Sequence, residues 1–284
     1  MADPESVSPS RMKRLFTWVR RHKIRTLLIL LLAFVLFELA TIPWFSVASL
    51  SARNPERTAL MEQRIGEAAK EGKSYRITQR WIGLSRIPRH VVNAVVVAED
   101  GTFWTHNGFD WFEVQASIEK NLKKRKAVRG GSTITQQLAK NLYLSTSKDP
   151  LRKAKEAIIT LLLEKSLSKA RILELYLNCI EWGRGIFGIE AASQAYFGKS
   201  ASALSLEEGA RLAAVIPSPL RQKPNAETRY VRYRTAIVLN RLAGRGMIPQ
   251  SQSEEDSSSQ TEPEEADIDD TDSTATDEGS SHGL

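Results

Sequence analysis

Two glutamates and a group of cations between residues 98 and 156 have the spacing of a group-transfer site. Glu99 ends an apolar run and precedes a glycine-containing loop, so burial would favour the protonated form of its carboxyl and suit a general base. Glu156 follows Arg152 by four residues and Lys153 by three, which places them on one helix face. Fixed cations stabilise a departing pyrophosphate without a proton donor, so this set suits transfer of a sugar from a phosphorylated carrier. Glu99 could instead be an ordinary charged residue at a helix end, and the cations around Glu156 could form a solvated basic helix face.

A glycine-rich turn between the two glutamates adds polar groups that suit an anionic ligand. Residues 130–133 precede a helical pattern whose predicted N-cap is Ser132, and backbone N–H groups at the start of a helix bind phosphate oxygens. The polar side chains that follow within two helical turns are Gln136, Gln137 and Lys140. No Gly-Lys-Ser/Thr follows the turn, so it is not a Walker loop. An ordinary turn before a helix is the alternative interpretation.

Helices are predicted to position these groups. Apolar periodicity and capping signals mark helical segments at 57–70, 88–99, from 110 onward, 132–142, 149–163, 170–180, 189–197, 205–216 and 229–242. The β-branched residues of 88–99 leave a buried strand as an alternative there. One short strand is expected within 75–82, and three glycines between 183 and 188 predict a flexible turn. The body, residues 52–248, is therefore predicted to be mainly α.

An apolar run at residues 24–45 is long enough to cross a bilayer as one helix. Its aromatic end and its length favour an uncleaved anchor over a signal peptide, whose apolar region would span only about 7–15 residues. The preceding segment, 1–23, carries a burst of basic residues, and such flanks stay in the cytoplasm. We therefore expect a single-pass protein of the cell inner membrane with a periplasmic catalytic domain.

The charge of the chain is strongly divided. Residues 1–250 hold all 40 Lys and Arg against 21 Asp and Glu, a net charge of +19, whereas 251–284 carries 12 acidic residues and no Lys or Arg. The tail has almost no apolar residues, so we expect it to be disordered. The basic body predicts an anionic partner, and the anchor favours a membrane or phosphorylated substrate over nucleic acid. The single cysteine, Cys179, excludes an internal disulfide and is predicted to lie in the core.

Five motifs in order resemble those of the peptidoglycan glycosyltransferases, the lipid II polymerases found alone or fused to transpeptidases. They are EDGTFWTHNG at 99–108, GGSTITQQ at 130–137, RKAKE at 152–156, KARILELYLN at 169–178, and GIFGIEAA at 185–192 leading to YFGK at 196–199. The resemblance covers about residues 75 to 220. No transpeptidase pattern follows, so the chain is similar to the monofunctional form.

The resemblance implies a lysozyme-like, mainly helical fold with two lobes and a cleft. It implies transfer of a growing glycan from undecaprenyl pyrophosphate to the 4-hydroxyl of an incoming lipid II, with inversion to a β-1,4 link. Glu99 would be the general base, and Glu156 would support the pyrophosphate together with nearby cations or through a divalent metal, Mg or Mn. No organic cofactor is expected. Cell-wall synthesis proteins are expected as further partners.

The resemblance also implies which residues contact the substrate. They come from the first three motifs and the segments beside them, and are Asp100, Phe103, His106, Ser132, Thr133, Gln136, Gln137, Lys140, Lys148, Arg152 and Lys153. For His106, a structural histidine bonded to its loop is the alternative. Lys148 stands where many relatives have arginine, so charge is kept but a bidentate grip on phosphate is not.

Two other functions fit parts of the pattern. A lysozyme-like glycan-cleaving enzyme would need a protonated general acid, which the cations around Glu156 disfavour. An inactive, membrane-tethered glycan-binding scaffold would keep the fold without the chemistry. Release of undecaprenyl pyrophosphate from lipid II separates all three functions.

Overall fold

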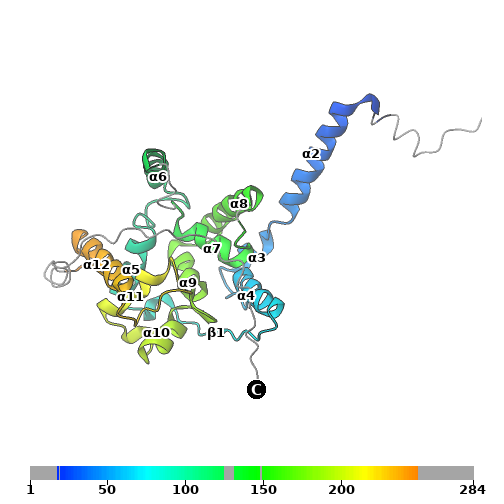
Figure 1. Cartoon of the computed structure of the whole chain (residues 1–284). Helices are drawn as coiled ribbons and strands as arrows, with labels where there is room; N and C mark the ends of the chain where they lie inside the picture. The colour runs from blue at the N-terminus through cyan, green and yellow to red at the C-terminus, as the bar shows by residue number, and fades with distance from the viewer. Residues whose placement is uncertain (1–17, 19, 125–130, 148, 249–284) are drawn as a thin grey trace, which may run out of the picture.

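The computed structural model describes residues 18, 20–124, 131–147 and 149–248 (Figure 1). The expected disorder of the tail at 251–284 and the predicted substrate contact of Lys148 therefore fall outside the described residues. Most of the basic segment 1–23 also falls outside them.

The predicted mainly α class is confirmed, and the order of the helices follows the sequence pattern closely. The helices are α2 (Lys23–Ala40), α3 (Trp44–Ser49), α4 (Ala59–Lys70), α5 (Arg89–Glu99), α6 (Trp111–Lys124), α7 (Ile134–Tyr143), α8 (Pro150–Ser166), α9 (Lys169–Cys179), α10 (Ile189–Phe197), α11 (Leu206–Val215) and α12 (Arg229–Gly244), with short 3-10 helices η1 (Leu84–Arg86) and η2 (Ala201–Ala203). The expected likeness to lysozyme stays a prediction.

The apolar N-terminal run forms a helix that projects from the body (Figure 1). No residue of α2 is buried, and a helix that is apolar and exposed on all sides is typical of a membrane span. Among the described residues, Lys23–Ser49 is the one helical segment long and apolar enough to cross a membrane. The run is interrupted at Thr41, because Pro43 lacks the N–H that a continuing helix needs. The short α3 that follows packs against α8.

The helices of the body pack in two groups that share one core. In the first group α5 lies against α11 and α12, and in the second α7 lies against α8, α9 and α4 (Figure 1). Buried side chains of both groups belong to a single hydrophobic cluster. Glu99 ends a helix of the first group, whereas Gln137 and Glu156 lie on helices of the second. The junction of the two groups therefore brings the candidate residues together.

The segment 88–99 is a helix, so the alternative of a buried strand is wrong. Six of the eleven residues of α5 are buried, because the helix is enclosed by α11 and α12. Gly209 of α11 permits this close approach, since a Cβ there would lie 2.9 Å from a methyl of Val91. Cys179 is fully buried at the end of α9, which confirms its predicted place in the core.

The predicted turn at the glycines is a tight turn at 184–185 between two short strands, with Gly183 in the first strand and Gly188 at the N-cap of α10. The strands β1 (Thr78–Gln79), β2 (Glu181–Gly183) and β3 (Ile186–Phe187) lie in the order β1-β3-β2, with β1 parallel and β2 antiparallel to β3. Gly185 has a φ of +74°, and a Cβ there would lie 2.3 Å from the carbonyl oxygen of Arg76. The glycine is therefore required for close approach of two chain segments.

Candidate active site

Glu99 lies at the C-terminal end of α5 with its carboxylate tied to a neighbouring helix. Its Oε2 accepts a hydrogen bond of 2.8 Å from Nε2 of Gln137 in α7. The Oε1 of Gln137 in turn accepts a 3.0 Å bond from the hydroxyl of Tyr176 in α9, which is fully buried. These two hydrogen bonds fix the side-chain amide of Gln137, and with it one carboxylate oxygen of Glu99. Oε1 of Glu99 has no hydrogen bond to any residue that the structure describes, so it is available to a ligand.

The surroundings of Glu99 raise the pKa of its carboxyl. Loss of solvent around the group is the largest cause, and the nearby charge of Asp100 adds to it. The hydrogen bond from Gln137 and the positive charges of Arg234 and Lys140 act in the opposite direction. A carboxylate with raised proton affinity and one free oxygen is suited to accept a proton.

Arginines of α12 hold the main chain around Glu99. Nη1 of Arg241 donates to the carbonyl oxygens of Val97 at 3.1 Å and Ala98 at 3.4 Å. Arg245 donates to the carbonyl of Gly101 in the following loop. These bonds satisfy carbonyls that the end of α5 leaves without helical partners. They therefore fix the direction in which the helix presents its last residue.

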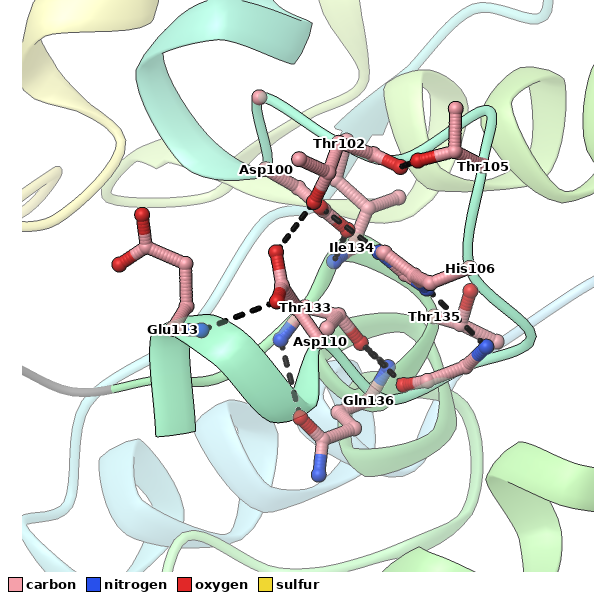
Figure 2. A network of polar contacts seen from close by, with 12 residues as sticks. Asp100, Thr102, Thr105, His106, Asp110, Glu113, Thr133, Ile134, Thr135 and Gln136 are labelled. Carbon is pink, nitrogen blue, oxygen red and sulfur yellow. Dashed lines mark hydrogen bonds and ion pairs between the residues drawn. The ribbon is translucent and has the colours of Figure 1, made fainter. Parts of the chain in front are cut away.

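The loop after Glu99 is ordered by a buried polar network (Figure 2). Asp100 accepts 2.9 Å bonds from Nε2 of His106 and from the backbone N–H of Ile134, the first residue of α7. The N–H of Gly108 donates to Nδ1 of His106 at 3.2 Å, which assigns the proton of the neutral ring to Nε2. The hydroxyl of Thr133 donates to the carbonyl of Gly108 at 2.7 Å. The network locks the loop to the N-terminus of α7.

The N-cap of α7 is Thr133 and not Ser132, which corrects the prediction from sequence. Thr133 and Gln136 form a reciprocal capping box, in which each side chain accepts from the other residue's backbone N–H. With Asp100 also bonded to Ile134, protein groups occupy most N–H groups at this helix start, where a phosphate was expected. Ser132 is exposed beside it.

The residues predicted to contact substrate thus divide into a buried set and an accessible set. Asp100, Phe103, Thr133 and Gln136 are buried, and the side chain of His106 is only 10% exposed. Their polar atoms bond within the loop network, and Phe103 lies under the ammonium of Lys169. The residues that remain at least partly accessible are Glu99, Ser132, Gln137, Lys140, Arg152 and Lys153. The buried set supports the accessible set.

Glu156 is buried in the first half of α8 between two cations. Its Oε2 accepts a 2.5 Å bond from Arg152, and its Oε1 accepts from Lys153, as their spacing on a helix predicts. Arg152 is fixed further by a 2.5 Å bond from its Nε to the carbonyl of Ser147. The side chain of Lys153 is half exposed, whereas that of Glu156 is 3% exposed. The carboxylate therefore holds both cations at the surface, where they can meet an anion.

Lys140 links the two glutamates. Its charge interacts with both Glu99 and Glu156, although it makes no hydrogen bond or ion pair with the residues that the structure describes. Burial lowers the pKa of its ammonium most, and the charges of Arg152 and Lys153 lower it further. The two glutamates oppose this shift. An ammonium placed in this way gains by meeting an anionic ligand.

The side chains around Glu156 do not fit a metal held by the protein. Both of its oxygens already accept from cations. Among residues 18, 20–124, 131–147 and 149–248, no group of three or more His, Cys, Asp or Glu side chains is arranged to hold an ion. The expected divalent ion stays a prediction, and the protein would supply at most Glu156 to it.

Sequence reasoning did not single out three supporting residues. Tyr176 lies within the fourth motif, but its contact with Gln137 joins positions 39 residues apart in the chain. Arg234 and Arg241 belong to a helix that carries none of the motifs, and only folding brings them to α5. No local signal distinguishes these arginines from those of a solvated helix face.

Comparisons with known proteins identify the family of the chain. A family model described as Transglycosylase matches residues 65–243. A biosynthetic peptidoglycan transglycosylase of Nitrosospira multiformis is 48% identical over 190 residues, which is 67% of this chain and 83% of the relative. One from Aromatoleum aromaticum is 49% identical over 199 residues, 69% of this chain and 85% of the relative. One from Thiobacillus denitrificans is 40% identical over 239 residues, 84% of this chain and 100% of the relative. The chain belongs to the transglycosylase family.

Proposed function

We propose that this protein is a peptidoglycan glycosyltransferase that polymerises lipid II into glycan strands. The observation that carries the proposal is that two packed helices, α7 and α8, bring together a carboxylate with one free oxygen, Glu99 bonded to Gln137, and a carboxylate bonded to two cations, Glu156. The first arrangement suits activation of a hydroxyl and the second suits a pyrophosphate leaving group. Membership of the transglycosylase family and the printed names of the relatives support the same reaction.

In the proposed reaction Glu99 acts on the acceptor. Oε1 of Glu99, which is not bonded to Gln137, takes the proton of the acceptor's 4-hydroxyl as the oxygen attacks the anomeric carbon of the donor. A C–O bond forms on one face of the sugar while the bond to the pyrophosphate oxygen breaks on the other. The configuration is therefore inverted, and a β-1,4 link results. The bond from Gln137 keeps the carboxylate aimed at the hydroxyl.

On the donor side, cations replace a general acid. The electron pair of the broken bond goes to the pyrophosphate, whose negative charge Lys140, Arg152 and Lys153 stabilise directly. Glu156 holds Arg152 and Lys153 in place and prevents their mutual repulsion from separating them. Because the residues do not fit a protein-held metal, we derive no step through one. Whether turnover needs Mg or Mn is a question for assay in a chelator.

The alternatives need features that this arrangement does not provide. A glycan-cleaving enzyme of lysozyme type requires a carboxylic acid that donates a proton to the glycosidic oxygen. Both oxygens of Glu156 accept hydrogen bonds from cations, so neither is placed to donate a proton to a glycosidic oxygen. An inactive scaffold would not need a raised pKa at Glu99 beside a fixed cation cluster.

We further propose that α2 anchors the enzyme in the inner membrane, with the catalytic domain in the periplasm. The basic flank before α2 supports this orientation, because such residues stay on the cytoplasmic side. The substrate and the product carrier would then share the membrane of the anchor. Other proteins of cell-wall synthesis are proposed partners that this placement would allow.

One assay on the purified full-length chain tests the function. The enzyme should convert lipid II to polymer and release one undecaprenyl pyrophosphate for each glycosidic bond formed. Cleavage of finished glycan without release of the carrier would instead indicate the lysozyme-like alternative. Binding of lipid II without either product would indicate the scaffold.

A further inference from the structure

A carboxylate stands in the apolar anchor helix. Glu38 lies in the last turn of α2, within the segment that is long and apolar enough to span a membrane. Ionisable residues in such segments are costly and are kept where they have a partner and a role. Glu38 pairs with Lys155 of α8 at 2.5 Å, and the two side chains are only 16% and 23% exposed. The pair therefore joins the anchor to the helix that carries Glu156.

Neither charge suits the helix on which it lies. Glu38 is near the C-terminus of α2, where the helix dipole is negative, and Lys155 is in the N-terminal half of α8, nearer the positive end. Each residue alone would slightly destabilise its own helix. The pair stabilises the contact between the two helices. Its role is therefore to fix α2 and α8 relative to each other.

The ion pair lies at an apolar hollow between the anchor helix and α8. A cavity of about 150 Å³ between the two helices is lined by Phe34, Val35, Leu39 and Ile42 from the anchor side and by Leu151, Ala154 and Ile158 of α8. Apolar contacts are not directional, so they allow one helix to slide along the other. An ion pair between partly buried groups fixes the register.

Two further contacts fasten the chain just after the anchor. The hydroxyls of Ser46 and Tyr143 lie 3.0 Å apart, joining α3 to α7. Arg171 of α9 donates to the carbonyls of Leu50 and Arg53 at 2.9 and 3.0 Å. The segment from α2 to residue 53 is thus attached to α7, α8 and α9, the helices that carry Lys140, Glu156 and Tyr176. The anchor is joined to the site itself and is not a loose tether.

We infer that Glu38 and Lys155 are positioning residues, which set the height of the cation cluster on α8 relative to the membrane surface. This inference rests on the proposed function, in which the pyrophosphate belongs to a membrane-embedded carrier. A carrier held in the bilayer presents its pyrophosphate at a fixed depth, so the cations must lie at that depth. A substrate in free solution imposes no such requirement.

The test compares two presentations of substrate to the purified full-length enzyme. Full-length lipid II is supplied in vesicles of phosphatidylethanolamine and phosphatidylglycerol that contain the enzyme. A lipid II analogue with a short, water-soluble prenyl chain is supplied in detergent without vesicles. Glu38→Lys and Lys155→Glu should each lower turnover in vesicles by on the order of 10- to 100-fold, as small misplacements of reacting groups do. Both variants should turn over the soluble analogue as the wild type does.

The double variant Glu38→Lys/Lys155→Glu should regain most turnover in vesicles, since it restores the pair and suits both helix dipoles. Lys165→Glu, an exposed charge change on the same helix, is the matched control and should behave as wild type. Protease protection checks that each variant keeps its orientation, and Glu38→Gln gives a milder variant if a single reversal does not fold.

Equal losses in both assays, or no rescue by the double variant, would overturn the inference. A wild type inactive in both assays would instead refute the proposed function.

Discussion

At the scale of single residues, burial and hydrogen bonding shift the pKa of the Glu99 carboxyl in opposite directions. Burial is the larger influence and raises its pKa above the ordinary value of 4.5. The group therefore becomes an active base only above that raised pKa. The bond from Gln137 limits the shift without occupying the second oxygen. Compared with an exposed carboxylate, the group therefore has a stronger affinity for the acceptor's proton.

Glu99→Gln should abolish most polymerisation, because an amide keeps the shape but cannot take the proton. General-base catalysis contributes roughly 10²–10⁴-fold, so the variant should retain less than about a hundredth of wild-type turnover. The wild-type rate should fall as the pH drops through the raised pKa of Glu99. The residual rate of the variant should not show this decrease at acidic pH. Rates of lipid II polymerisation across pH measure both.

Glu71→Gln is the control for this change, since Glu71 is exposed and pairs only with Lys73 in the described part of the chain. It should polymerise like the wild type at every pH. Residual activity of Glu99→Gln above about a tenth of wild type would be too high for loss of the base and would refute its assigned role.

The same substitution should leave the fold at least as stable at neutral pH. A carboxyl whose pKa is raised on folding binds its proton more tightly in the native state, so its contribution to stability is full below the unfolded pKa and is lost as pH rises through the folded pKa. The neutral amide of Glu99→Gln avoids that loss. Thermal unfolding should therefore give the variant an equal or higher midpoint at neutral pH, with the difference shrinking at acidic pH. A lower midpoint at neutral pH would show that Gln137 and the nearby cations outweigh desolvation.

Tyr176→Phe should separate positioning from proton transfer. The change removes the only hydroxyl bonded to Oε1 of Gln137 among the described residues, and loss of this part-buried bond should lower the unfolding free energy by about 0.5–1.5 kcal/mol. The amide would then hold Glu99 less firmly, so turnover should fall by less than in Glu99→Gln. The acidic limb of the pH profile should persist, since the base is still present. Loss of that limb would mean that Tyr176 takes part in proton transfer.

At the scale of elements, two neighbouring hydroxyl residues at the start of α7 have different roles. Thr133 caps the helix and bonds to the loop, whereas Ser132 is exposed. Thr133→Ala should lower the unfolding free energy by about 0.5–2 kcal/mol, the usual cost of losing a cap. Ser132→Ala should leave stability unchanged and raise the KM for lipid II if Ser132 contacts substrate. Chemical denaturation and kinetics of the two variants distinguish them, and equal destabilisation would contradict the assignment of the cap.

Local signals were enough to predict most helices and the pairing of Arg152 with Glu156, because both depend on residues within a few positions. The short strand expected within 75–82 is present as β1, but its partner β3 was not predicted, since their pairing joins Thr78 to Ile186 across more than a hundred positions. The capping residue of α7 was misplaced for a related reason. Asp100 and Gly108, far away in sequence, bond to Ile134 and Thr133 and decide where the helix begins. Contacts between distant residues are therefore what the sequence alone leaves out.

At the scale of the whole molecule, packed helices connect the anchor, the cation cluster and the base. The Glu38–Lys155 pair joins the anchor to α8, which carries Glu156, and α8 packs against α7, whose Gln137 holds Glu99. The donor's pyrophosphate would enter from the membrane side, and the acceptor's hydroxyl would meet Glu99 beyond it. A glycan that grows in this direction would extend away from the membrane.

The proposed topology places the body outside the cytoplasm. The basic residues before α2 favour that orientation, and α2 is long and apolar enough to serve as a retained anchor. A reporter fused after Ile248, beyond the last helix, should therefore be active only when it requires export, and α2 should remain in the mature protein. N-terminal sequencing and paired reporters that work on opposite sides of the membrane measure both. Cytoplasmic activity of the fusion, or a mature chain that begins near residue 46, would contradict the proposed topology.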